Sequence, residues 1–339
     1  MNNHSFWKIR PWEKFLVGVT CAYILFFYLL RTRNYDFFSF LTWQAQAFEK
    51  SFYWFSGLFI FLVAYAYFKL LRFLTAFSLA KKTGDRTQIK EEGIKVLYSL
   101  AEGARFLFLI VFAFAAFMLV LGAITSLAQG RVDSLKILEW DKKIFGVYPF
   151  IWLHTPSNPF RPFLHSISWL ILRSFTCLSL IMGASLIFFF FFGQRKIFFS
   201  ILAAYFIGAT ISLPFWYVYP SHSPNNFYLA NNNILSSDYE PDRITESFQI
   251  EVQRDQKKNP PISTFPSSHA IWALEVVYFW GIYKKKSLFF FIPWIFLMLL
   301  GTVYFAQHYL VDIILAVPIA FLAIIGGNKV GDLMQKEEV

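Results

Sequence analysis

Charged residues and cysteines are both scarce in this sequence. Only 15% of its 339 residues are charged and two are cysteines, whereas 57% are hydrophobic and 21% are aromatic. Such a composition, with a positive mean hydropathy, lies outside the range of a soluble domain. The two cysteines, Cys21 and Cys177, fall in segments expected near opposite faces of a membrane, which argues against a disulfide. The sequence therefore predicts an all-α, polytopic membrane bundle.

Three further features are missing. No nucleic-acid-binding module is visible, and the net charge of +10 is explained by cations placed where membrane orientation requires them, so we expect no nucleic-acid partner. No internal repeat is evident, which argues against transporters built from duplicated halves. The apolar run that follows the charged start lacks a small-residue cleavage site, so we expect a retained span rather than a removed signal peptide.

Apolar stretches about 20 residues long predict eight membrane spans. They are centred on residues 15–30, 53–71, 105–127, 167–193, 197–219, 265–283, 287–306 and 309–327. The expected organisation has four parts. These are an N-terminal pair of spans in 1–80, a cytosolic connector in 81–104, a six-span core in 105–327 and a cytosolic tail in 328–339.

Lysine and arginine are concentrated in three segments, 69–105, 195–196 and 284–286. In an eight-span arrangement these segments share one side with both termini, and the positive-inside rule makes that side cytoplasmic. Two long hydrophilic loops, 128–166 and 220–264, then lie on the periplasmic, extracellular or lumenal side. We expect an interfacial helix at 140–153 in the first loop and a weak helix at 242–256 in the second.

Two short strings near the C-terminus place histidines beside apolar runs. Phe-Pro-Ser-Ser-His-Ala occupies 265–270, and Gln-His-Tyr-Leu-Val-Asp occupies 307–312. The 39 residues from His269 to His308 allow one crossing of the membrane and one return, which brings both histidines to the same face. A histidine at a membrane boundary is a costly placement unless it is paired or functional.

The surroundings of these histidines indicate chemistry on an anion. Asp312 follows His308 by one helical turn, so its carboxylate can hold one ring nitrogen and orient the other. Pro266 suits the first turn of a helix that Ser263 or Thr264 can cap, which leaves the amides of 267–269 free for a phosphate.

The sequence resembles the type 2 phosphatidic acid phosphatase superfamily on the strength of these motifs. Pro-Ser-Ser-His at 266–269 and His-Tyr-x-x-Asp at 308–312 resemble its second and third motifs. Its inositol phosphorylceramide synthase branch, which contains inositolphosphotransferases, is the most similar in the aromatic loop 141–153, in Tyr219-Pro220 and in the segment 302–309. The resemblance covers about 105–327.

The resemblance implies a mechanism and a site. His308 attacks phosphorus to form a phosphohistidine, Asp312 fixes its tautomer, and His269 protonates the leaving oxygen and then deprotonates the acceptor. No metal or cofactor is implied. Ser267 and Ser268 are expected to donate hydrogen bonds to the phosphate. Further candidates for substrate contact are His222, Tyr304 and Gln307, the last two of which can instead only pack.

Two departures concern the cations that bind phosphate. The phosphatases carry Ser-Arg six residues before the third-motif histidine, where this sequence has Gly301 and Thr302, and their first motif Lys-x(6)-Arg-Pro is matched only by a string that starts at His154 and contains Arg161. Arg173, inside the fourth span, is the preferred cation, although it can also snorkel to the interface. Arg161 is the second candidate. Cations of the second loop are weaker ones, at 243, 254, 257 and 258.

Three other histidines, His154, His165 and His222, fall on the outer side without a carboxylate one turn away, so we expect surface positions for them. The substrate is expected to be a membrane lipid, with a lipid hydroxyl, a polyol or water as acceptor. The leading hypothesis is thus a lipid phosphatase or phosphotransferase. The alternatives are a transporter or scrambling protein that uses the histidines as a proton relay, and a catalytically silent scaffold of the same fold.

Overall fold

The computed structural model describes a large part of the chain. The described residues are 9–30, 67, 70–71, 73–75, 77–78, 86–128, 131–229, 239–256 and 265–338. Every regular element among them is helical, which confirms the all-α prediction. The predicted span at 53–71 lies almost entirely outside the described residues.

The chain divides into two compact units near residue 120. The described helices of the first unit are α1 (Pro11–Leu30) and the N-terminal part of α3 (Arg86–Ala128), a single helix of 43 residues that takes in most of the expected connector as well as the third predicted span. Arg105 and the buried Glu13 form an ion pair of 2.7 Å between these two helices, and Arg10 pairs with Glu102. The described second unit begins in the last turns of α3 and runs to Glu337.

Five helices in the described residues are long and apolar enough to cross a membrane, and a sixth crossing is obtained if a bent pair counts as one span. The pair consists of α7 (Ser168–Thr176) and α8 (Leu178–Phe191), which meet at 45°. These helices show a multi-pass membrane protein. The predicted fourth span, 167–193, is therefore a broken helix rather than a straight one.

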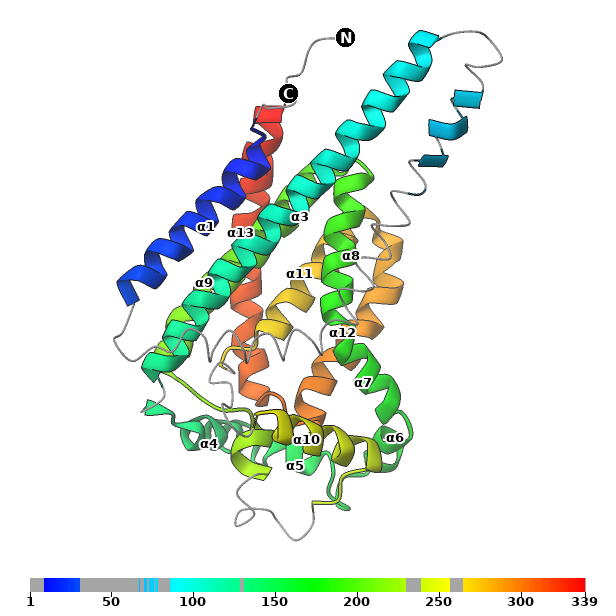
Figure 1. The fold of residues 1–339 in the computed structure, drawn as a ribbon. Coiled ribbons are helices and arrows are strands. Elements are labelled where there is room, and N and C mark those ends of the chain that lie inside the picture. Colours follow the sequence, from blue (N-terminus) through cyan, green and yellow to red (C-terminus); the bar gives the residue numbers. More distant parts are fainter. Residues whose placement is uncertain are drawn as a thin grey trace. The chain divides into compact units, whose positions relative to one another are not determined.

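Four further long helices of the second unit begin close to their predicted starts (Figure 1). They are α9 (Arg195–Val218), α11 (Ser268–Tyr283), α12 (Leu288–Tyr304) and α13 (Leu310–Glu338). α13 extends beyond the predicted end at 327 through most of the expected tail. With 16 residues, α11 is short for a membrane crossing, which takes roughly 20 residues. α11 packs against α8, α9 and α12, so it occupies the interior of this bundle.

Short helices gather at the end of the bundle where α12 and α13 meet (Figure 1). They are α4 (Ser134–Phe145), α5 (Pro149–Trp152), α6 (Arg161–Ser166) and α10 (Arg243–Gln256). The expected interfacial helix at 140–153 is interrupted, because Gly146 adopts a left-handed backbone with φ of 74° and ends α4. The weak helix expected at 242–256 is present as α10.

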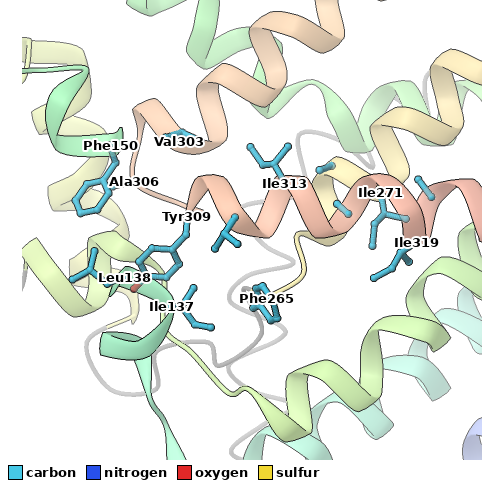
Figure 2. Close-up of a cluster of buried hydrophobic side chains, with 14 of the residues drawn as sticks. Ile137, Leu138, Phe150, Phe265, Ile271, Val303, Ala306, Tyr309, Ile313 and Ile319 are labelled. Atoms are coloured by element: carbon cyan, nitrogen blue, oxygen red, sulfur yellow. The ribbon is translucent and has the colours of Figure 1, made fainter. Parts of the chain in front are cut away.

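A buried cluster joins these short helices to the junction of α12 and α13. Figure 2 shows Tyr309 next to Leu138 of α4 and Phe150 of α5, with Ile313 further along α13 and Phe265 coming from the segment before α11. Burying aromatic side chains of this size stabilises the packing by about 1.5–3 kcal/mol for each ring. The packing fixes the segment that carries His308 against α4 and α5.

Candidate active site

Two histidines and an aspartate form a chain of hydrogen bonds at this end of the bundle. The Nδ1 atom of His269 lies 3.1 Å from Nε2 of His308, and Nδ1 of His308 lies 3.2 Å from Oδ2 of Asp312. Because an ionised carboxylate only accepts hydrogen bonds, His308 donates from Nδ1 and carries a lone pair on Nε2, which accepts from His269. Asp312 is fully buried and His308 is 4% exposed. The arrangement therefore directs Nε2 of His308 toward any group that takes the place of His269.

The backbone holds His308 outside a helix. After α12 ends at Tyr304, Ala306 takes a positive φ of 55°, and the amides of Gln307 and His308 both donate to the carbonyl oxygen of Thr302 at 2.9 Å. Asp312 Oδ2 also accepts from the amide of Tyr309 at 3.0 Å. His308 and Asp312 therefore meet across the first turn of α13 rather than along one continuous helix.

Asp141 of α4 anchors the same turn from the other side. Its two carboxylate oxygens accept from the amides of Leu310 at 3.0 Å and Val311 at 2.8 Å. Burial raises the pKa of Asp141 to about 6, although these backbone hydrogen bonds act in the opposite direction. In the sequence, Asp141 could be recognised only as a member of the aromatic loop 141–153. Residue spacing gives no sign that its carboxylate caps α13, which begins 169 residues later.

The start of α11 differs from the prediction. The helix begins at Ser268, and its N-cap is Ser267, whose hydroxyl accepts from the amide of Ala270 at 3.2 Å. The expected caps at 263 and 264 lie outside the described residues. The amide of Ser267 donates to the carbonyl oxygen of Asp312 at 3.2 Å, so it is not free for an anion. Within the described residues, the amides of Ser268 and His269 remain available at this positive helix end.

Aromatic rings pack beside His269. The ring centre of Phe175 lies 5.6 Å from that of His269, and the ring of Phe248 in α10 lies 6.3 Å from Phe175 and 5.1 Å from Phe305. Phe248 thus packs α10 against α7 and the residue that follows α12, next to the histidine pair. His308 is almost completely buried, and His269 is partly buried.

Comparison with known proteins identifies the family. The family model described as PAP2 superfamily matches residues 145–326, which is just over half of the 339 residues. This chain belongs to the PAP2 superfamily. Members of the superfamily are generally phosphatases, which supports a membrane phosphatase or phosphotransferase. No curated protein and no solved structure matches the chain in the same comparisons.

The packing of α7 on α12 explains one departure from the PAP2 phosphatase motifs. A Cβ atom on Gly301 would lie 3.1 Å from Cβ of Phe175 and 3.2 Å from Cγ2 of Ile171. These approaches are tighter than ordinary contacts, so the serine that the phosphatases carry at this position would not fit without a shift of α7. The absence of a side chain at Gly301 places Phe175 beside His269.

The two preferred cations lie away from the histidine pair. Arg161 forms an ion pair of 2.5 Å with Glu240. Arg173 is exposed, and its guanidinium lies 5.5 Å from the ring centre of Trp169, one turn earlier on α7. Since Ile171 and Phe175 face Gly301, a residue midway between them points to the opposite side of the helix. The role of both arginines in phosphate binding stays a prediction.

The other predicted contact residues have defined neighbours. The Tyr304 hydroxyl donates to Oδ2 of Asp242 at 2.6 Å, and the side chain of Gln307 donates to the carbonyl oxygen of Phe305 at 3.2 Å. The amide of His222 donates to the Ser134 hydroxyl at 2.9 Å. The bond of Tyr304 joins the end of α12 to the segment before α10, the bond of His222 joins its loop to α4, and the bond of Gln307 is local. Substrate contact by these residues stays a prediction.

The expectation of surface positions is wrong for His154, which is fully buried, and only partly right for His165 and His222, which are partly buried. The sequence argument sought a carboxylate one turn away. The carboxylate comes instead from Asp242, 77 residues beyond His165, and His154, His165 and Asp242 bring one ligand atom each within 4.8 Å of one another.

A buried carboxyl deeper in the bundle also escaped the sequence argument. Glu275 of α11 is fully buried, and a Cβ atom on Gly208 of α9 would lie 2.8 Å from its Oε1 atom. Neither oxygen of Glu275 has a hydrogen-bond partner among the described residues. Its position within an apolar helix could have indicated it, because ionisable residues inside membrane spans are rare.

Proposed function

We propose that this PAP2 superfamily member is a phosphotransferase or phosphatase that acts on a lipid phosphate or phosphodiester through a phosphohistidine on His308. The observation that carries the proposal is the chain of hydrogen bonds from His269 through His308 to the buried Asp312. A lone pair on Nε2 of His308, fixed by a carboxylate at Nδ1, is what a nitrogen nucleophile requires.

In the first half of the proposed reaction, the phosphoryl group enters between His269 and His308. Nε2 of His308 forms a bond to phosphorus while the bond from phosphorus to the leaving oxygen breaks. His269 acts in this step as the imidazolium, gives that oxygen a proton and becomes neutral. Asp312 stabilises the positive charge that develops on His308. In the second half, His269 takes a proton from an incoming hydroxyl or water, whose oxygen attacks phosphorus and releases His308.

The amides of Ser268 and His269 support binding of the phosphate. They are free within the described residues and lie at the positive end of α11, which favours negative charge. The hydroxyl of Ser268, the first residue of α11, belongs to the same helix end. We assign these groups to the non-reacting phosphate oxygens, and Arg161 or Arg173 can contribute only if its side chain leaves its present neighbour.

The aromatic rings near the site support an amphiphilic substrate and transfer to an alcohol. Phe175 lies beside His269 and packs through Phe248 against Phe305. We infer that these rings, together with a bound lipid, limit the access of water, so that a phosphohistidine survives until an acceptor hydroxyl arrives. The replacement of the Ser-Arg pair by Gly301 and Thr302 also separates the chain from the simple phosphatases. We therefore favour the inositol phosphorylceramide synthase branch, with a lipid or polyol hydroxyl as acceptor.

The helix directions support an active site on the outer side of the membrane. α11 runs from the site at Ser268 to the basic turn 284–286, and α9 begins beside a second basic turn at 195–196. Both basic turns are thus at the helix ends away from the site. The positive-inside rule makes those ends cytoplasmic, together with both termini, and the site periplasmic, extracellular or lumenal.

The deciding experiment uses purified full-length protein in detergent with lipid extract labelled on phosphate. We expect label in a new lipid, free phosphate as a minor product, and a transient label on the protein that acid removes and base does not. H308A and H269A should each abolish turnover, and H308A should also lose the labelled protein. The matched control is D332N, on the same helix as Asp312 but in an exposed ion pair with Lys196. Full activity in H308A or H269A would refute the proposal.

A further inference from the structure

The outer loops bring together three potential metal ligands apart from the His269–His308 pair. His154 follows α5, His165 is in α6, and Asp242 precedes α10. One ligand atom from each lies within 4.8 Å of the others. They come from segments separated by up to 88 positions, so their meeting is a product of the fold rather than of local sequence.

The histidine nitrogens are arranged as in a metal site. Nε2 of His154 lies 2.9 Å from the carbonyl oxygen of Tyr304 and donates to it, which leaves the lone pair on Nδ1. Nδ1 of His154 and Nε2 of His165 are both buried without a hydrogen-bond partner among the described residues. A buried acceptor without a partner is costly. A donated bond from the far nitrogen to a backbone carbonyl is how metal-bound histidines are usually oriented.

The carboxylate is held in an equally defined position. Oδ1 of Asp242 accepts from the amides of Ile244 and Thr245, and Oδ2 accepts from the hydroxyls of Thr245 and Tyr304, both at 2.6 Å. Either hydroxyl can turn aside to free a lone pair for a cation. Burial disfavours the ionised form, but hydrogen bonds from Thr245, Tyr304 and Ile244 together lower the pKa of Asp242.

The charges around the three residues also fit a cation. Arg161 is the nearby positive charge, and its ion pair with Glu240 offsets it. The charge of Asp242 is thus left to attract a dication.

We propose that His154, His165 and Asp242 form a binding site for a divalent transition metal, with Zn²⁺ as the best match. Two imidazoles and one carboxylate are a common zinc ligand set, with ligand distances of about 2.0–2.2 Å and a fourth position left for water. Ligand atoms in such a tetrahedral site are about 3.4 Å apart, so the side chains need to close by little more than about an ångström.

The metal would act as a structural clasp. It would join the α5–α6 segment to the start of α10, and Tyr304 would link both to the end of α12, four residues before His308. The helix α10 would then be fixed next to the histidine pair. A metal in this position would take no part in the phosphoryl chemistry. The proposal therefore goes beyond the function proposed above, and the two can be tested independently.

The test is the metal content of full-length protein purified through a tag without histidine, loaded with Zn²⁺ or Co²⁺ and then dialysed. We expect about one metal per chain and, with Co²⁺, the visible absorption of a tetrahedral site. H165Q and D242N should each lower the retained metal more than ten-fold. Asparagine still caps a helix, so D242N keeps α10 intact.

Matched controls separate the site from nonspecific binding. H222Q removes another histidine and D332N removes a carboxylate that pairs with Lys196, and both variants should retain the metal. The melting temperature should rise with Zn²⁺ in the wild type and in both controls but not in H165Q. Wild-type protein that retains no metal after loading, or H165Q and D242N that retain as much as the wild type, would overturn the proposal.

Discussion

The second unit contains two sets of side chains that each consist of two histidines and one aspartate. The two sets differ in whether their members are hydrogen-bonded to one another. In the set of His269, His308 and Asp312, each group is hydrogen-bonded to the next, which holds the proton on Nδ1 of His308 and the lone pair on its Nε2. In the set of His154, His165 and Asp242, the ligand atoms converge without bonding to one another, and the carboxylate is held by a helix start and a tyrosine. The direction of the lone pairs, rather than the residue types, separates a candidate for chemistry from a candidate for metal binding.

Exchanging a histidine in each set should give the largest contrast. H308A removes the proposed nucleophile, and we expect turnover of a labelled lipid panel to fall at least about 10³-fold. H154Q removes a proposed metal ligand and should retain at least about a tenth of the activity while losing bound metal. Initial rates and metal content, measured on the same preparations, check both. Equal losses of activity in the two variants would contradict the assignment of catalysis to the first set and of metal binding to the second.

The two aspartates give the next contrast. D312N leaves the shape of the side chain but can no longer hold the proton on Nδ1 of His308 as an anion, so we expect a loss of about 10²–10⁴-fold in kcat with little change in KM. D242N should lower kcat less than about ten-fold, because asparagine preserves the cap of α10. Steady-state kinetics with one substrate decide between these outcomes, and a D242N loss as large as that of D312N would contradict the assignment.

Asp141 tests how far the first set depends on its support. D141A leaves the amides of Leu310 and Val311 without an acceptor, and we expect a loss of about 1–3 kcal/mol in the free energy of unfolding. Activity should fall less than in D312N, because Asp141 contacts neither histidine. Thermal unfolding in detergent measures the stability. An unchanged melting temperature would show that water satisfies these amides.

The pH dependence of this stability has a defined sign. The pKa of Asp141 is raised in the folded protein from 3.8 to about 6, so the folded state binds its proton more tightly than the unfolded state does. The contribution of Asp141 to stability is therefore greatest below about pH 4 and declines as the pH rises through about 6. The difference in melting temperature between wild type and D141A should shrink over that range, and a growing difference would contradict the raised pKa.

The smallest effect is expected from Tyr304, which connects the two sets. Y304F removes the hydroxyl that donates to Asp242 but keeps the backbone carbonyl that His154 bonds. We expect a loss of about 1 kcal/mol in stability and activity within a few-fold of the wild type. A loss comparable to that of D312N would instead place the hydroxyl in contact with the substrate.

The sequence predicted the first set and missed the second, for a physical reason. His269 and His308 occupy two helix ends separated by one membrane crossing and return, and Asp312 is one turn from His308, so chain geometry alone brings them together. His154, His165 and Asp242 meet only through the folding of loops, for which residue spacing carries no rule. The helix range 197–219 could be predicted because a long apolar run defines it, whereas α13 continues to Glu338, beyond the apolar run at 309–327.

Other details could not be predicted because they depend on packing. The bend between α7 and α8 has no proline or glycine to mark it, and the interruption after Phe145 follows from the left-handed turn at Gly146. The direction of Arg173 depends on which face of α7 meets Gly301, and composition does not reveal that face. Asp141 was visible as a motif member but not as the partner of a distant helix.

The hydrogen bonds between Asp141 and the first turn of α13 restrict which segments of this protein can be exchanged with those of its relatives. A chimera that exchanges residues 134–145 for a foreign segment without a carboxylate at position 141 would leave the start of α13 uncapped, even if every residue of both histidine strings were retained. Chimeras that aim to change the acceptor preference should therefore exchange α4 and residues 307–312 together.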